Sequence, residues 1–195
     1  MNASYLSLIL ARLAEPLAAS LGLSLWGVEA ACGGRGTAPV HRVYVDGADG
    51  VDVERCAELS RLLGLALDVE DCMAGPYTLE VSSPGLERRF FTAEQLAGAA
   101  GARVEVSFWA PPAPGSERRN FQGRMISAGE GRFVLALEEE EGTLLSFSFE
   151  QVRKIRQRFL VPEKTKPGKA GGGNKNRPRR DAAPAQAIPS APRPA

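Results

Sequence analysis

The stretch that decides the fold reads Tyr77-Thr78-Leu79-Glu80-Val81-Ser82-Ser83-Pro84-Gly85-Leu86-Glu87-Arg88-Arg89-Phe90. It begins as a strand, because Tyr77, Leu79 and Val81 alternate with polar residues. The strand ends at Ser83-Pro84-Gly85, since proline cannot donate to a sheet ladder and glycine permits a sharp change of direction. Two arginines follow the turn. We therefore expect a rigid polar corner, rich in hydrogen-bond donors, close to a domain boundary.

The residues ahead of this stretch predict the order helix, strand, strand, helix, strand. The first helix is expected to begin at the N-cap Ser4 and end before Gly22, with a kink near Arg12 imposed by Pro16. Asp52 is expected to cap the second helix. Two helices on one face of a small mixed sheet bury the apolar sides of both layers, which predicts a two-layer α/β domain over residues 1–90. The predicted ranges are 4–21 and 53–67 for the helices, and 23–31, 40–46 and 77–83 for the strands.

The residues after the stretch change to a period of two. Residues 84–101 are expected to be a link that holds a short helix over 92–99. Five short strands with tight turns then predict a small closed or partly closed β-barrel over residues 91–161. Periodicity alone leaves the SH3-like and OB-like barrels as open alternatives. The strands are expected from Ala102 to Phe108 and over 120–126, 132–137, 144–149 and 154–159.

Composition and charge narrow the class of protein. Residues 162–195 hold eight basic and two acidic residues, a net charge of +6 that leaves −5 for the rest of the chain, given its total of +1. This basic tail has almost no large apolar residue, so we expect it to be disordered. No apolar run is long enough to span a membrane, and no signal peptide is expected. The three cysteines indicate a reducing, cytoplasmic setting.

Residue types that support catalysis or metal binding are present but lack the required spacing. Cys32, Cys56, Cys72 and the single histidine, His41, form no pair with zinc-ligand spacing, and burial explains them better. Ser82 and Ser83 lack a nucleophile elbow, so we expect them to brace a turn. The glycines of residues 33–36 form no phosphate loop, and the acidic residues 138–141 indicate a solvated turn. The sequence therefore predicts neither an enzyme nor a bound cofactor.

Arginine and lysine side chains are the remaining candidates for a binding site. The planar guanidinium of arginine matches phosphate oxygens, and small barrels often bind RNA through one strand face and adjoining loops. The basic tail favours contact with nucleic acid. The predicted interaction and turn motif comprises Ser82, Ser83, Pro84, Gly85, Leu86, Arg88 and Arg89. The predicted contacts with RNA or a protein partner are Arg42, Arg118, Arg119, Lys154 and Arg156.

The motif of residues 77–88 resembles the hallmark of the bacterial RimP-type ribosome maturation factors. Weaker matches surround it in the right order and extend the resemblance over about residues 4–162. They are Leu25-Trp26-Gly27-Val28-Glu29, Arg42-Val43-Tyr44-Val45-Asp46, residues 52–61, Asn120-Phe121-Gln122-Gly123 and Leu160-Val161-Pro162. The family usually continues Leu-Asp-Arg-Pro-Leu where this chain has Leu86-Glu87-Arg88-Arg89-Phe90. Arg89 in place of the usual proline predicts a less rigid exit from the turn.

The resemblance implies both a fold and a function. The expected fold is an α+β protein whose two-layer N-terminal domain precedes an SH3-like (Sm-like) barrel. The expected function is maturation of the small (30S) ribosomal subunit by transient binding of a cytoplasmic monomer, without catalysis. The implied partners are a ribosomal protein of the decoding centre and nearby rRNA. A free-standing RNA-binding adaptor that uses the barrel and the basic tail is the alternative.

Overall fold

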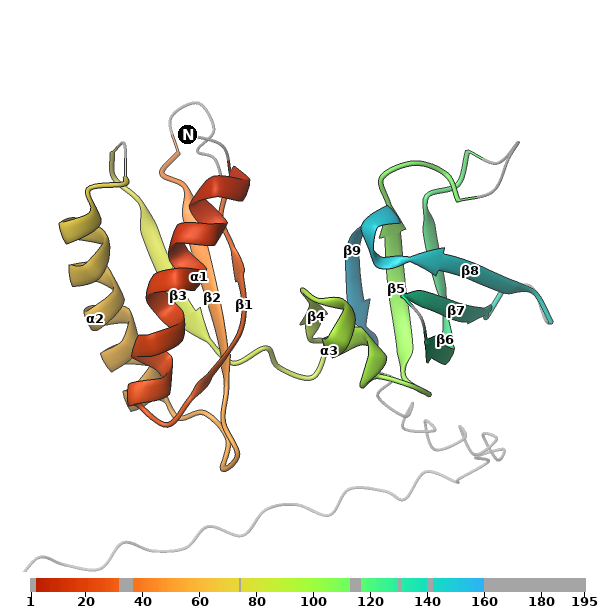
Figure 1. Ribbon diagram of the computed structural model, residues 1–195, viewed down its shortest axis with the longest axis horizontal. Coiled ribbons are helices and arrows are strands. Elements are labelled where there is room, and N and C mark those ends of the chain that lie inside the picture. Colours follow the sequence, from red (N-terminus) through yellow and green to blue (C-terminus); the bar gives the residue numbers. More distant parts are fainter. Residues whose placement is uncertain are drawn as a thin grey trace, which may run out of the picture. The chain divides into compact units, whose positions relative to one another are not determined.

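A computed structural model describes residues 3–31, 37–73, 75–112, 117–129, 131–139 and 142–159. Among them the chain forms three helices and two sheets, which confirms a mixed α and β protein (Figure 1). The predicted basic tail, residues 162–195, lies outside the described residues. The helices are α1 (Ala3–Ser20), α2 (Val53–Glu70) and α3 (Ala93–Ala97).

The first sheet has three strands in the order β1-β2-β3, with bounds β1 (Ser24–Glu29), β2 (Val40–Asp46) and β3 (Thr78–Ser82). The β1–β2 pair is antiparallel and the β2–β3 pair is parallel, so the sheet is mixed as predicted. Figure 1 shows α1 and α2 together on one face of this sheet. Alternate residues of β2 point into the core between the layers, where His41, Val43 and Val45 are almost completely buried.

Helix ends follow the predicted local chemistry at most positions. Asp52 caps α2 by accepting a hydrogen bond from the Arg55 amide at 2.7 Å, and Thr92 caps α3 in the same way. The end of α1 is closed by Gly22 at a φ of +69°. The N-cap prediction for Ser4 is wrong, because the described part of α1 already includes Ala3. Pro16 lies inside α1, and the kink remains a prediction.

The second sheet has six strands in the order β4-β9-β5-β6-β7-β8. All of the ladders inside it are antiparallel, and β4 and β8 lie at its two ends. The five predicted strands of this region are confirmed, but no ladder between described residues closes the sheet into a barrel. The strand bounds are β4 (Arg89–Phe90), β5 (Arg103–Phe108), β6 (Asn120–Gly129), β7 (Arg132–Leu137), β8 (Leu144–Ser148) and β9 (Val152–Gln157).

Strand β4 is a correction to the sequence interpretation, which treated residues 84–101 as a link. Arg89 pairs with Arg156 and Phe90 pairs with Ile155, so the end of the deciding stretch belongs to the second sheet. Phe90 is buried with Leu96 in the core cluster that also contains Phe108. The Phe108 ring meets the Phe147 ring edge-on at a centroid distance of 5.4 Å.

None of the described helices is long and apolar enough to cross a membrane.

The core of the first sheet holds one polar side chain, His41, which is 1% exposed. Within the described part of the chain neither of its ring nitrogens has a hydrogen-bond partner, and the ring packs at 5.7 Å from the ring of Tyr77. Burial lowers the pKa of His41 from its usual value of 6.5, because the charged imidazolium would lose its hydration.

This burial predicts a fold that weakens in mild acid. Above pH 6.5 His41 is neutral in both the folded and the unfolded chain, so it does not affect stability. Below that pH the unfolded chain takes up a proton that the folded chain does not, so the free energy of unfolding falls as the pH falls. Urea unfolding at about pH 7.5 and about pH 5.5 measures the loss.

The matched variant is His41→Leu, which fills a similar volume and does not titrate. Since the chain has one histidine, the variant should lose less stability than the wild-type chain over this pH interval. An equal loss in the two proteins would show that His41 is not the group responsible.

Candidate functional site

The turn after β3 is built as the sequence predicts. Gly85 adopts a φ of +69°, a left-handed conformation that costs other residues free energy. A Cβ atom at this position would meet no atom within 4 Å, so only the backbone conformation favours glycine. Ser82, Ser83 and Leu86 are exposed, and the Leu86 side chain is 67% exposed. The Ser82 and Ser83 hydroxyls therefore lie at the surface of the turn, and neither forms a hydrogen bond within the described residues, so the prediction that they brace the turn is not confirmed.

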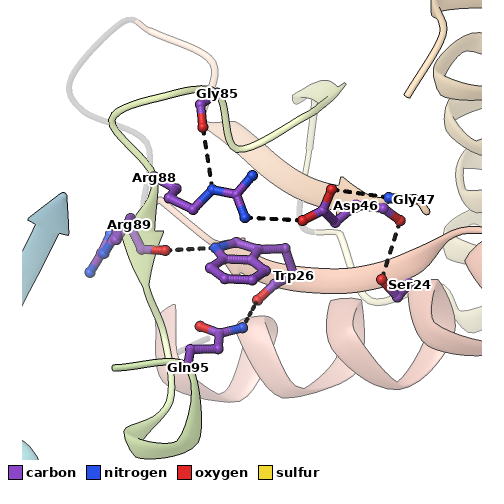
Figure 2. A network of polar contacts seen from close by, with 8 residues as sticks. All are labelled: Ser24, Trp26, Asp46, Gly47, Gly85, Arg88, Arg89 and Gln95. Carbon is purple, nitrogen blue, oxygen red and sulfur yellow. Dashed lines mark hydrogen bonds and ion pairs between the residues drawn. The ribbon is translucent and has the colours of Figure 1, made fainter. Parts of the chain in front are cut away.

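Arg88 joins this turn to the first sheet. Its guanidinium is 3.1 Å from the Asp46 carboxylate of β2, and its Nε donates to the Gly85 carbonyl (Figure 2). The same guanidinium lies over the Trp26 ring of β1, with Cζ 4.8 Å from the ring centroid. Arg88 is thus an internal contact that connects the turn to the first sheet.

Trp26 makes the corresponding contact to the second sheet. Its indole Nε1 donates to the Arg89 carbonyl of β4 at 2.7 Å, and its own carbonyl accepts from the Gln95 side chain of α3 at 2.6 Å (Figure 2). Gln95 also accepts a hydrogen bond from the Phe91 amide. Trp26 therefore connects β1 with both β4 and α3.

The hydrogen-bond pattern of β4 explains why the Arg89 carbonyl is available. The Gln157 amide donates to the Arg88 carbonyl, so the neighbouring pair, Arg89 and Arg156, is the non-bonded type of an antiparallel ladder. Both backbone groups of Arg89 consequently point away from β9. The carbonyl meets Trp26, and the guanidinium forms an ion pair with Glu29 of β1.

The outer face of the six-stranded sheet carries most of its positive charge. Along each strand the basic side chains alternate with buried apolar ones such as Val104 and Ile155. Two acids lie among them: Glu105, which is opposite Arg156 and 3.7 Å from Arg158, and Glu138, which pairs with Arg103. We call this surface the basic sheet face. Its basic residues are Arg89, Arg103, Arg124, Arg132, Lys154, Arg156 and Arg158.

A polar cavity of about 310 Å³ lies on the basic sheet face, lined by Glu105, Ser107, Asn120, Lys154 and Arg156. Lys154 pairs across the ladder with Ser107, whose hydroxyl lies 2.6 Å from the Asn120 carbonyl oxygen. Partial burial lowers the pKa of the Lys154 amine, and the charges of Arg156 and Arg89 lower it further. Within the described residues neither Lys154 nor Arg156 has an ion-pair partner, so their donors can bind an anion.

Two of the other predicted contact residues, Arg118 and Arg119, directly precede β6. They therefore lie at the end of β6 where Asn120 lines the cavity. Arg118 donates to the Asn120 carbonyl, pairs with Glu139 and lies over the Phe121 ring. Arg119 is exposed. Four predicted contacts therefore belong to this sheet or its approach, whereas Arg42 lies in the first sheet in an ion pair with Glu80.

Sequence reasoning missed Ser107, Asn120 and Trp26. The alternation of Arg103, Glu105 and Ser107 against apolar residues shows that one strand face is polar. It does not show which residues of β6 and β9 lie opposite, because that depends on the strand register.

The described residues offer few side chains arranged for metal binding or acid-base chemistry. They contain no group of three or more His, Cys, Asp or Glu side chains that could hold a metal ion. Cys32 and the glycines of residues 33–36 lie outside the described residues. Glu138 forms an ion pair with Arg103 and Glu139 with Arg118, while Glu140 and Glu141 are not described.

The geometry of the turn predicts unequal effects for two nearby substitutions. Gly85→Val should lower the free energy of unfolding by about 1–2 kcal/mol, because a β-branched residue resists the left-handed conformation. Glu87→Ala, an exposed change in the same turn, should stay within about 0.5 kcal/mol of wild type. Gly85→Asn should fall between them, since asparagine tolerates this conformation better. Equal losses for the valine and alanine variants in urea unfolding would contradict the turn assignment.

Comparison with known proteins agrees with the motif. A family model described as the RimP N-terminal domain matches residues 13–87. The ribosome maturation factor RimP of Nitratidesulfovibrio vulgaris (strain DP4) is 42% identical over 168 residues, covering 84% of this chain and 96% of the relative. A protein of the same name from N. vulgaris (strain DSM 19637 / Miyazaki F) is 34% identical, with 88% and 91% covered. Another from Lawsonia intracellularis is 33% identical, with 84% and 93% covered. The chain therefore belongs to the RimP family.

Proposed function

We propose that this protein is a ribosome maturation factor that assists assembly of the small ribosomal subunit. The observation that carries the proposal is the 42% identity to a protein named ribosome maturation factor RimP over nearly all of that relative's length. The family model that matches residues 13–87, a region that includes most of the motif, agrees with it. The protein acts by transient binding to the immature particle, as a cytoplasmic monomer, and not by catalysis.

The basic sheet face is the proposed surface for rRNA phosphates. Lys154 and Arg156 contribute charge-assisted donors, and Ser107 and Asn120 contribute neutral polar groups beside them. Arg118 and Arg119 extend the contact along the approach to β6. The turn motif from Ser82 to Arg89 shapes the surface by joining the two sheets through Arg88 and Arg89.

The finer architecture belongs to the same proposal. We divide the chain into an α/β domain over residues 1–90, an SH3-like barrel over 91–161 and a basic tail over 162–195, with Arg89 and Phe90 at the end of the first segment contributing β4 to the second sheet. The strand order β4-β9-β5-β6-β7-β8 supports the barrel assignment, because adjacent strands along the chain from β5 to β8 pair in a meander. A ribosomal protein of the decoding centre is the proposed protein partner.

Deleting the protein should leave the cell with excess free small subunits that carry incompletely processed rRNA. Sedimentation of cell extracts and analysis of small-subunit rRNA ends measure both effects. Normal subunit ratios and fully processed rRNA in the deletion strain would overturn the proposed function.

The double variant Lys154→Ala/Arg156→Ala should bind immature small subunits more weakly. Its plot of log affinity against log salt concentration should be shallower by about 2, since two phosphate contacts are lost. The matched control is Arg12→Ala/Arg61→Ala, which removes two exposed arginines from the helices of the first sheet. Equal slopes for the two double variants would overturn the assignment of the basic sheet face as the rRNA contact but would leave the proposed ribosomal function standing.

A further inference from the structure

Strand β3 is an edge strand of the first sheet, since among the described residues it forms a ladder with β2 alone. The Thr78 amide donates to the Pro39 carbonyl at 2.9 Å. This bond shows that the backbone groups of Thr78 point toward β2. Alternate residues along a strand bond to alternate sides, so the backbone groups of Leu79 and Val81 point away from β2. An edge with unpaired donors and acceptors is a template for another strand.

The opposite edge of the same sheet differs from β3. On β1 the Trp26 carbonyl already accepts from the Gln95 side chain, and the Phe91 ring lies against Gly27. A Cβ atom at Gly27 would come within 2.1 Å of that ring, so the approach is very close. The edge of β1 is therefore covered at its centre, and β3 is the edge that remains accessible.

A groove of about 510 Å³ runs between β3 and α2. Its α2 wall is one helix face, because the lining residues follow the spacing i, i+3, i+4, i+7. Val53 at the end of this wall is 79% exposed although it is apolar. An edge strand beside a helix groove is the arrangement that binds an extended peptide by strand addition. The lining residues are Val53, Cys56, Ala57, Ser60, Leu79, Glu80, Val81 and Ser82.

The negative charge of the first sheet and its helices favours a cationic partner for the groove. Residues 1–82 contain eleven acidic and five basic residues. Glu80 lines the groove and pairs with Arg42, and nearby Arg55 and Arg61 pair with Asp52 and Glu58, so these three ion pairs balance one another. The excess negative charge beside the groove comes from Glu54, which follows Val53, is exposed and has no ion-pair partner among the described residues. This surface attracts cations and repels phosphate, which disfavours RNA as the ligand here.

We propose that β3 and α2 form a docking site for an extended, cationic peptide segment of a partner protein. The segment adds as a fourth strand beside β3 and bonds to the backbone of Leu79 and Val81. Its small apolar side chains enter the groove, and its lysines or arginines face the surrounding carboxylates. The site is distinct from the basic sheet face, and the inference does not depend on the ribosomal role.

The test uses the full chain and a fluorescein-labelled peptide of about five Lys-Val repeats, which has the alternation that strand addition needs. Val53→Arg should weaken binding by about tenfold or more, because it places positive charge and bulk at the groove. The matched control is Val69→Arg, the same change at an 88% exposed position of α2 outside the groove. It should bind as wild type does.

Amide hydrogen exchange on the wild-type chain tests the geometry without any variant. Saturating peptide should slow exchange of the Leu79 and Val81 amides. Equal binding by the two arginine variants, or no added protection at these amides, would overturn the proposal. So would equal binding of a peptide of about five Glu-Val repeats, because charge selects the ligand. Protection of the same amides by single-stranded RNA would overturn the peptide assignment, because it would identify the ligand of this site as a nucleic acid.

Discussion

The hydrogen bond from the Trp26 indole to the Arg89 carbonyl is the contact on which the arrangement of the other groups around the turn depends. It satisfies a backbone acceptor that β4 directs away from its own sheet, and it satisfies the only donor of the indole ring. A buried polar group left without a partner costs about 1–3 kcal/mol. Arg88 stacks over the same ring, so the course of the chain after β3 is determined by the position of one tryptophan.

Charge is divided unevenly along the described chain. The residues that form the first sheet and its helices are predominantly acidic, whereas the outer face of the second sheet carries seven basic residues and two acids, Glu105 and Glu138. The net charge of −5 outside residues 162–195 therefore conceals a second surface on which basic side chains predominate. A protein of this kind can contact an RNA phosphate backbone with one sheet and a cationic protein segment with the other, as an assembling ribonucleoprotein particle would require.

Local chemistry was predictable from sequence wherever a few neighbouring residues decide the structure. The Asp52 cap, the bounds of β2 and the positive φ of Gly85 follow from side-chain spacing, capping groups and steric limits on the backbone. Strand β4 could not be predicted from the sequence, because two residues are too few to show the alternation of polar and apolar side chains. The cavity that joins Lys154 to Ser107 and Asn120 also escaped prediction, since cross-strand register depends on the turns and bulges of three strands.

Contacts between residues far apart in the sequence were the hardest to predict. Trp26 is separated from Arg89 by 63 positions and from Gln95 by 69, and the sequence around it shows only a strand. The orphaned nitrogens of His41 were equally hidden, because its position among apolar residues predicts burial but not the absence of a partner. The family resemblance supplied what these patterns could not, namely the expected type of barrel and the role of the protein.

The ladder geometry of β4 has a consequence for how this position can vary among relatives. The backbone N–H of Arg89 makes no ladder bond with β9, so the imide nitrogen of a proline would fit there without loss. A proline, which the resemblance leads us to expect here, would therefore cost this position no ladder hydrogen bond. Proline and arginine differ in how the exit from the turn is restrained, by a closed ring in one case and by an ion pair with Glu29 in the other. An ion pair weakens with salt and a ring does not, so the restraint at this position of the chain is ionic and depends on salt concentration.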